Sequence, residues 1–383
     1  MKNYRPRVAF LVETSIKYGR DILSGINEYL SAEGNWSVYV DQSQLFDLPA
    51  EEIFADSWDG MILRNITPEI KEKLIKLKIP VIDLDDNHET DVFHRIVSDH
   101  FGIGVMGAEH LLERGFKKFG FLSFNEKWSH ERCQGFTETL TQNGYKCSVF
   151  ESPWRGDEVR NWTQEQNEIL KWLKSLSMPV AVMACNDIRA LHLINICNVH
   201  GISIPEDVCI LGVDNDEIFC EISTPPLSSI CPNAKAVGMR AARLLDRLMK
   251  GDKVEISTEL VEPARVFSRR STDVLAIEDE VMRAALNYIS ENACYGCTVS
   301  DVARELLVSR SLLERRFRKF LNTSPQTEIR KVQIKQAKKL LLETEFPLTR
   351  ISQLTGFEYP EYFNVVFKRM TGTTPGGFRK SEK

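Results

Sequence analysis

Short apolar runs alternate with longer segments of helical spacing through residues 7–272. The first run, residues 8–12, is followed by a helical stripe over 22–30 and then by a second run at 36–40. This order predicts strand, helix, strand. Further apolar runs occupy residues 60–63, 81–84, 119–122, 180–183 and 208–213.

These runs are continuously apolar instead of alternating, which is typical of strands in a parallel sheet covered on both faces. We therefore predict a largely parallel α/β sheet. About 265 residues is large for one such sheet, so the region is expected to form two lobes. Ligands of these sheets bind at the carboxyl ends of strands. Polar residues follow four of the predicted strands, at Glu13, Thr14 and Ser15, at Asp83, Asp85 and Asp86, at Asn186 and Asp187, and at Asp214, Asn215 and Asp216.

The strand pattern stops after Thr272, and every segment from Glu278 onward has helical spacing. We expect an α/β domain over 6–272, a linker over 273–278 and a helical domain over 279–383.

Within the helical domain, apolar stripes at 299–306 and 312–317 are separated by a short break, and Ser309 is suited to cap the second helix. Two short helices joined this closely predict a helix-turn-helix. The pattern recurs over 348–354 and 362–367 around a turn at Gly356, so we predict two units in tandem, joined by a helix around 332–341.

Composition places the 383-residue chain among ordinary globular proteins, with 43% hydrophobic and 27% charged residues. No apolar run approaches the roughly 20 residues that cross a bilayer, and the N-terminus lacks the apolar core of a signal peptide. The nine cysteines are odd in number and scattered. We therefore expect a cytoplasmic protein with buried free thiols.

Charge is distributed unevenly along the chain. From Ile277 onward there are 18 Lys and Arg against 13 Asp and Glu, a net charge of +5, whereas the preceding residues carry −10. A polyanionic partner is therefore expected to bind the C-terminal part.

Two local motifs are expected to have no chemical role. Gly102, Gly104 and Gly107 match the dinucleotide-binding spacing, but Asp99 is placed to cap a helix that would contain them. Cys294 and Cys297 have zinc-ligand spacing without a second pair. No local motif brings together the residues of a catalytic site. We therefore expect no catalytic residues, no metal and no cofactor, and we expect that the protein is not an enzyme.

The C-terminal hundred residues resemble AraC-type transcription factors. The resemblance rests on the first unit, 299–317, and on the closing signature 362–368 with Gly372, Thr374-Pro375 and Phe378-Arg379. Two positions depart from the family pattern: Leu307 stands at the turn position usually held by Gly, and Ser352 stands where Ala is usual.

The N-terminal part resembles the effector-binding core of LacI-type repressors and ribose-type periplasmic binding proteins, through 184–187, 205–208 and 210–215. The two resemblances together imply a two-lobed periplasmic-binding-protein-like α/β domain followed by an all-α double helix-turn-helix domain.

A sugar needs hydrogen-bonding side chains for its hydroxyls and an aromatic surface for its C–H face. The resemblance places effector ligands at Arg132, Asn186, Asp187 and Asp214. Trp128 or Tyr18 is suited to supply the aromatic surface. Structural roles remain open for these residues: a helix cap for Asp187, a strand-end turn for Asp214 and a surface ion pair for Arg132.

Two further acidic positions are effector candidates. Glu13 stands where smaller polar residues are common in the family, and Asp85 belongs to an acidic cluster with Asp83 and Asp86 that either faces the cleft or forms a solvated loop.

For DNA binding, the second helix of each unit is expected to present base-contacting side chains and cations on one face. Ser311 and Arg315 match base-contacting positions of the AraC-type family, and Arg suits a bidentate contact with guanine. The alternative is a merely solvated helix face. The DNA-binding candidates are Arg310, Ser311, Arg315 and Arg318 in the first unit, and Tyr359, Glu361, Asn364 and Val365 in the second.

The resemblances imply a sugar-responsive transcription factor that binds a double-stranded DNA operator and a monosaccharide, with D-xylose as the expected effector. They further imply activation of pentose catabolic genes, hence RNA polymerase as a partner, and a homodimer without membrane contact. The alternatives are a regulator for another monosaccharide, or a sugar-binding receptor or enzyme on the same α/β fold.

Overall fold

A computed structural model describes residues 4–41, 53–54, 56–64, 66–87, 92–153, 161–273 and 279–382. The chain divides into two compact units between Leu275 and Ala276. Of the predicted linker 273–278, only Asp273 belongs to the described residues. No helix in these described ranges is both long and apolar enough to cross a membrane.

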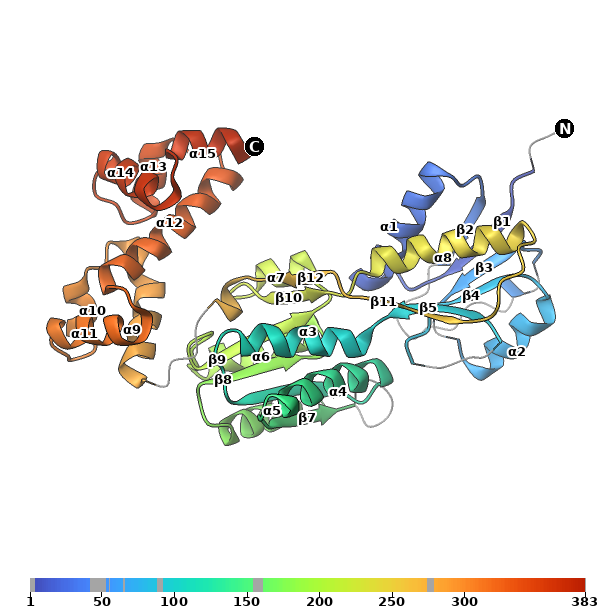
Figure 1. The fold of residues 1–383 in the computed structure, drawn as a ribbon, viewed down its shortest axis with the longest axis horizontal. Helices are drawn as coiled ribbons and strands as arrows, with labels where there is room; N and C mark the ends of the chain where they lie inside the picture. The colour runs from blue at the N-terminus through green and yellow to red at the C-terminus, as the bar shows by residue number, and fades with distance from the viewer. Residues whose placement is uncertain are drawn as a thin grey trace. The chain divides into compact units, whose positions relative to one another are not determined.

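The first unit contains two six-stranded sheets, each the centre of one lobe (Figure 1). The sheet of the first lobe has the order β11-β5-β4-β3-β1-β2, with all its neighbouring strands parallel. Its elements are β1 (Arg7–Leu11), α1 (Lys17–Ala32), β2 (Ser37–Val40), β3 (Gly60–Leu63), α2 (Pro68–Leu77), β4 (Val81–Asp83), β5 (His94–Ser98), α8 (Ala234–Met249) and β11 (Thr258–Val261).

Alternating residues of β1 explain how this lobe is layered. Val8 and Phe10 pack in one core with α1 and α8, whereas Ala9 and Leu11 pack in another with α2. Because strand side chains alternate between faces, a wholly apolar strand requires a helical layer on each side. Figure 1 shows α1 and α8 side by side.

The second lobe repeats this architecture with the strand order β12-β10-β9-β8-β6-β7, in which only the β10–β12 pair is antiparallel. Its elements are α3 (His100–Leu112), β6 (Phe119–Phe124), α4 (Lys127–Gln142), β7 (Cys147–Ser152), α5 (Trp162–Ser175), β8 (Val180–Ala184), α6 (Asp187–Val199), β9 (Val208–Val213), α7 (Glu217–Ile222), β10 (Ser228–Cys231), β12 (Arg265–Phe267) and the 3₁₀ turn η2 (Arg270–Thr272). The prediction of two parallel α/β lobes is confirmed.

The glycine-rich stretch lies inside α3, as predicted. The side chain of Asp99 caps this helix by accepting a hydrogen bond from the amide of Gly102. A Cβ atom on Gly104 would collide with the carbonyl oxygen of Arg132 in α4. Gly104 is therefore required by close helix packing.

The chain passes between the lobes three times in the first unit. The crossings lie between β5 and α3, between β10 and α8, and between β11 and β12. The carboxyl ends of strands in both lobes border a common cleft, because residues that follow β3 and β4 in the first lobe and β8 and β9 in the second line it.

The second unit is helical. Its elements are α9 (Glu280–Asn292), η3 (Ala293–Tyr295), α10 (Val299–Glu305), α11 (Arg310–Leu321), α12 (Pro325–Glu343), α13 (Leu348–Leu354), α14 (Pro360–Thr371) and α15 (Pro375–Glu382). Ser309 caps α11 by accepting from the amide of Leu312, as predicted. The pairs α10–α11 and α13–α14 are the two predicted helix-turn-helix units.

Each helix-turn-helix has its own apolar core, and α12 contributes side chains to both cores. Ile329 packs with Leu313 and Phe317 in the first core, whereas Ala337 packs with Phe363 in the second. Between these positions, Nε2 of Gln333 donates to the carbonyl oxygens of Ala293 and Gly356 at 2.8 and 3.2 Å.

All nine cysteines are free thiols. Four are buried, namely Cys185, Cys197, Cys209 and Cys220, and the others are half-buried. The expectation of buried thiols therefore holds for these four, and not for the five half-buried cysteines.

Candidate functional site

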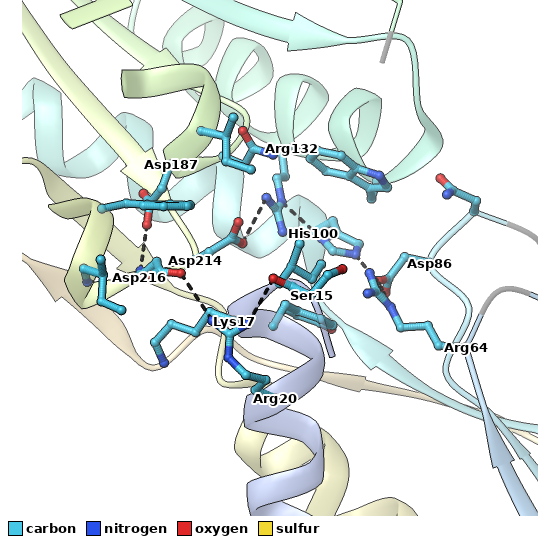
Figure 2. A pocket seen from close by; sticks show the side chains of 18 residues that line it. Ser15, Lys17, Arg20, Arg64, Asp86, His100, Arg132, Asp187, Asp214 and Asp216 are labelled. Carbon is cyan, nitrogen blue, oxygen red and sulfur yellow. Dashed lines mark hydrogen bonds and ion pairs between the residues drawn. The ribbon is translucent and has the colours of Figure 1, made fainter. Parts of the chain in front are cut away.

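The facing strand ends of the two lobes enclose a cavity of about 220 Å³ (Figure 2). Strand ends from both lobes contribute to its lining, which consists of Ser15, Ile16, Lys17, Tyr18, Arg20, Arg64, Asp86, Asn87, His100, Trp128, Arg132, Asn186, Asp187, Ile188, Asp214, Asp216, Ile218 and Phe219. Six of the eight predicted effector residues are among them.

Arg132 projects from α4 into the cavity and is itself almost wholly buried. Its Nη1 donates to the carbonyl oxygen of Cys185 and lies 3.8 Å from a carboxylate oxygen of Asp214. Its guanidinium also covers the ring of Trp128 at 4.8 Å. A buried, multiply held guanidinium provides rigid donors for a polar ligand.

His100 and Asp86 connect Arg132 to the first lobe. Nε of Arg132 donates to Nδ1 of His100 across 3.2 Å, and Nε2 of His100 lies 3.1 Å from Oδ1 of Asp86. Arg64 donates from Nη2 to Oδ2 of the same carboxylate at 2.7 Å. Burial acts to raise the pKa of Asp86, but Arg64 and His100 outweigh it and hold that pKa well below its usual range.

Asp214 lies at the carboxyl end of β9, in a turn where both it and Asn215 have positive φ values of 110° and 47°. Its side chain is one quarter exposed. Burial raises the pKa of this carboxyl to about 6, despite the opposing effect of Arg132. It is a hydrogen-bond acceptor for a ligand hydroxyl when ionised.

Asp187 also lines the cavity, but its oxygens are already occupied. Oδ1 accepts from the hydroxyl of Ser229 at 2.6 Å, and Oδ2 accepts from the amide of Asp216 at 2.8 Å. Burial, reinforced by Asp214, raises the pKa of Asp187 well above its ordinary value. Its contacts indicate that it supports the turn containing Asp214.

Asn186 caps α6 by accepting from the amide of Arg189 at 2.9 Å through Oδ1. A primary amide has separate donor and acceptor ends, so the donor end stays available to a ligand. The Tyr18 hydroxyl pairs with Ser98 at 2.8 Å, and Arg64 covers the Tyr18 ring.

Two predicted effector residues, Glu13 and Asp85, lie outside the cavity lining. The carboxylate of Glu13 is buried against Arg64. Asp85 accepts from the backbone amides of Ile66 and Asn87 at 2.8 and 2.7 Å, so it fastens the loop after β4. The acidic cluster is buried, not solvated, and its member at the cavity is Asp86.

Sequence reasoning missed several lining residues, chiefly Arg64, His100, Lys17 and Arg20. Arg64 directly follows the predicted strand 60–63, so the strand-end rule already pointed to it. At the cavity mouth, Lys17 lies 3.6 Å from Glu217, and Arg20 lies 3.7 Å from Asp216. These ion pairs join the first lobe to the second, and Figure 2 shows the one between Arg20 and Asp216.

The cavity thus combines carboxylates, guanidinium groups, two amides and three aromatic rings, which matches the surface of a polyhydroxylated ring. Among the described residues, no group of three or more His, Cys, Asp or Glu is arranged to hold a metal ion.

The predicted DNA-binding residues lie on α11, or at the start and along α14, and all eight are exposed. Leu313 and Phe317 of α11 point into the first core, as do Phe363 and Val366 of α14 into the second. Arg310 lies 2.9 Å from Glu314, one turn along the exposed face. Each second helix therefore presents an exposed face while its apolar face is packed, and the exposed face of α14 includes the hydrophobic side chain of Val365.

Three family models match successive parts of the chain. Residues 7–96 match the XylR N-terminal domain, residues 108–272 the periplasmic binding protein-like domain, and residues 302–381 the helix-turn-helix domain.

Curated relatives match this chain over nearly its whole length. The Xylose operon regulatory protein of Haemophilus influenzae is 32% identical over 97% of this chain and 98% of its own, and that of Escherichia coli K12 is 30% identical over 98% and 97%. A solved structure of the xylose-binding transcription activator xylR superposes with a TM-score of 0.83 at 28% identity, covering 100% of this chain and 99% of that one. These relatives are transcription regulators, not enzymes. The chain belongs to the family of xylose operon regulatory proteins.

Proposed function

We propose that this protein is a D-xylose-dependent transcriptional activator of pentose catabolic genes. The observation that carries this proposal is the cavity in which Asp214, Arg132 and Asn186 face Trp128 and Tyr18, in a chain that also has two helix-turn-helix units. The names of the Haemophilus and Escherichia relatives and of the similar solved structure support xylose as the sugar and activation as the outcome.

In this proposal the sugar binds between the lobes, with its hydroxyls on Asp214, Arg132 and Asn186 and a C–H face on Trp128. The bound sugar stabilises one arrangement of the α/β unit, and this arrangement favours the DNA-bound state. α11 and α14 contact bases through Arg315 and Asn364, among others. The protein works as a homodimer in the cytoplasm and engages RNA polymerase from its operator.

The test is the melting temperature of the full chain with and without D-xylose, D-ribose, L-arabinose, D-glucose and D-fucose at millimolar concentration. A ligand that binds only the folded state raises the melting temperature. We expect a shift with D-xylose. A shift with another sugar alone would replace the effector, and the absence of any shift would refute the sugar site.

A further inference from the structure

The turn after β9 links the cavity to the end of the α/β unit. Asp214 faces the cavity, while the next residue, Asn215, is 4% exposed and points its polar atoms away from solvent. The amide of Asn215 donates to Oγ of Ser229 at 2.9 Å. Two consecutive residues with positive φ make this turn strained, so its geometry depends on the contacts that hold it.

Arg269 makes one of those contacts. Its Nη1 donates to Oδ1 of Asn215 at 2.9 Å and to the carbonyl oxygen of Leu227 at 3.1 Å. Its Nε donates to Glu221 at 2.9 Å, and its side chain is 15% exposed. Because the planar guanidinium is rigid, a shift of Asn215 would also change the hydrogen bonds of Arg269 to Leu227 and Glu221.

The backbone around Arg269 is equally well fixed. Its amide donates to Oγ of Ser228 at 2.7 Å, and Oγ of Ser271 donates to the carbonyl oxygen of Ile210 at 2.6 Å. Nε of Arg114 donates to the carbonyl oxygen of Thr272 at 2.7 Å. Ser228, Ser271 and Thr272 are wholly buried. This segment is followed directly by the residues that lead into the helical unit, which begins at Ala276.

We propose that Arg269 is the residue that couples effector binding at Asp214 to the chain leading into the DNA-binding unit. The inference rests on the proposed function. A ligand that engages Asp214 selects one geometry of the strained turn, and Asn215 and Arg269 carry that geometry to the segment 269–272. Coupling of this kind is a difference in binding free energy between two sites, so it is measured as a ratio of affinities.

The experiment measures that ratio in the full chain. The DNA probe is a duplex selected by the wild-type protein from random-sequence DNA in the presence of D-xylose. The Kd for this duplex is measured with and without saturating D-xylose, and the Kd for D-xylose is measured by calorimetry. For the wild type we expect a DNA affinity ratio of about 5 to 150.

The main variant is Arg269→Met, which keeps an apolar stem and removes every donor. Its D-xylose Kd is expected to stay within about threefold of the wild-type value, whereas its DNA affinity ratio falls to within about twofold of one. The matched control is Arg270→Met. Arg270 belongs to the same segment but pairs with Glu206 at 2.8 Å, away from the turn, so its ratio should remain that of the wild type.

Asn215→Gly provides the second variant, because glycine adopts positive φ without strain and removes the acceptor for Arg269. It decides the question if Arg269→Met does not fold. A wild-type ratio in whichever of these variants folds would overturn the role of Arg269, while a lost ratio supports it. If the wild-type protein itself shows no effect of D-xylose on DNA affinity, the proposed function fails and this inference fails with it, a result visible before any variant is made.

Discussion

Nε2 of His100, at the start of the second lobe, lies 3.1 Å from Oδ1 of Asp86 in the first lobe. The other ring nitrogen, Nδ1, accepts from Nε of Arg132, so it must be unprotonated and the ring proton resides on Nε2. One neutral imidazole therefore joins a cation of one lobe to an anion of the other.

Replacing His100 with Leu is expected to weaken D-xylose binding about tenfold or more, because Arg132 and Asp86 each lose a buried partner worth about 1–3 kcal/mol. Calorimetric titration of both proteins measures the change. His130→Gln is the matched control, since His130 lies on the same helix as Arg132 but pairs with Glu151 at the exposed surface. Equal losses in both variants would contradict the role of His100.

The affinity for D-xylose should fall as the pH decreases through about 6, because Asp214 then becomes protonated and loses acceptor capacity. Arg132, Arg64, Asp216 and Asp86 are the charged groups that act on this carboxyl. Titrations at pH 5.0, 6.0 and 7.5 measure the effect. In Asp214→Asn the decrease should be smaller, and a wild-type affinity that is constant over this range would contradict the prediction.

The folding stability of the sugar-free protein should depend on pH in the opposite direction, because Asp214 should make the folded state less stable as the pH rises. The pKa is higher in the folded state than in the unfolded state, so the unfolded chain releases this proton first as pH rises. The contribution of Asp214 to folding stability is thus complete below about pH 4 and is lost as the pH rises to about 6. Comparing wild type with Asp214→Asn by chemical denaturation at these pH values isolates it.

Arg315→Ala is expected to cost about 1–3 kcal/mol on the selected duplex and to relax one base position, with a smaller loss on scrambled DNA. Arg304→Ala is the control, because Arg304 is a 79% exposed cation on the preceding helix and already pairs with Asp301. Binding isotherms on both duplexes test this. An identical loss of binding free energy on cognate and scrambled DNA would show that Arg315 contacts a phosphate and not a base.

Leu307 occupies the turn of the first helix-turn-helix with φ 53° and is 92% exposed. The left-handed conformation costs a leucine about 1–2 kcal/mol, part of which glycine recovers. Leu307→Gly should therefore stabilise the protein by about 0.5–1 kcal/mol in chemical denaturation. Leu342→Gly, at an exposed position in the last turn of α12, should instead destabilise it. Destabilisation by both variants would be evidence against strain at Leu307.

Gly356 holds the equivalent turn of the second unit, with φ 72°. A Cβ atom there would lie 2.7 Å from the carbonyl oxygen of Ala293. Gly356→Ala should cost about 1–3 kcal/mol of stability, as strained positive-φ residues do. Gly376→Ala in α15 meets no atom within 4 Å and should be neutral or slightly stabilising. Similar denaturation midpoints for the two variants would refute this account.

Apolar runs predicted the strands whose residues are apolar on both faces, and they failed where buried strands carry polar side chains. β5 contains His94 and Arg95, both buried. Arg95 is accommodated by Asp83, which lies 3.4 Å from its Nε, and by the carbonyl oxygen of Asp85, which accepts from its Nη2 at 2.7 Å. β10 begins with two buried serines: the amide of Ser228 donates to Oγ of Ser271, and Oγ of Ser229 donates to Asp187. The residues that bind these polar groups are not adjacent to them in sequence, so periodicity alone does not reveal β5 and β10.

The site was predictable to the level of strand ends and not to the level of individual carboxylates. Asp85 and Asp86 are neighbours, yet one binds backbone amides and the other faces the cavity. Which one faces inward depends on Arg64 and His100, contributed by other elements. Glu13 likewise follows a strand, but the same arginine draws it away from the cavity.

The uninterrupted helix α12 has a consequence for the operator. Its 19 residues span about 28 Å, close to the roughly 34 Å of one DNA turn, and Gln333 ties both flanking units to its middle. In the proposed DNA complex, α12 would therefore fix the distance between the two helix-turn-helix units. Each base pair inserted between the two contacted DNA segments would rotate one of them by about a tenth of a turn around the duplex. Under the proposed function we therefore expect the operator to keep that spacing constant even where the bases between the segments vary.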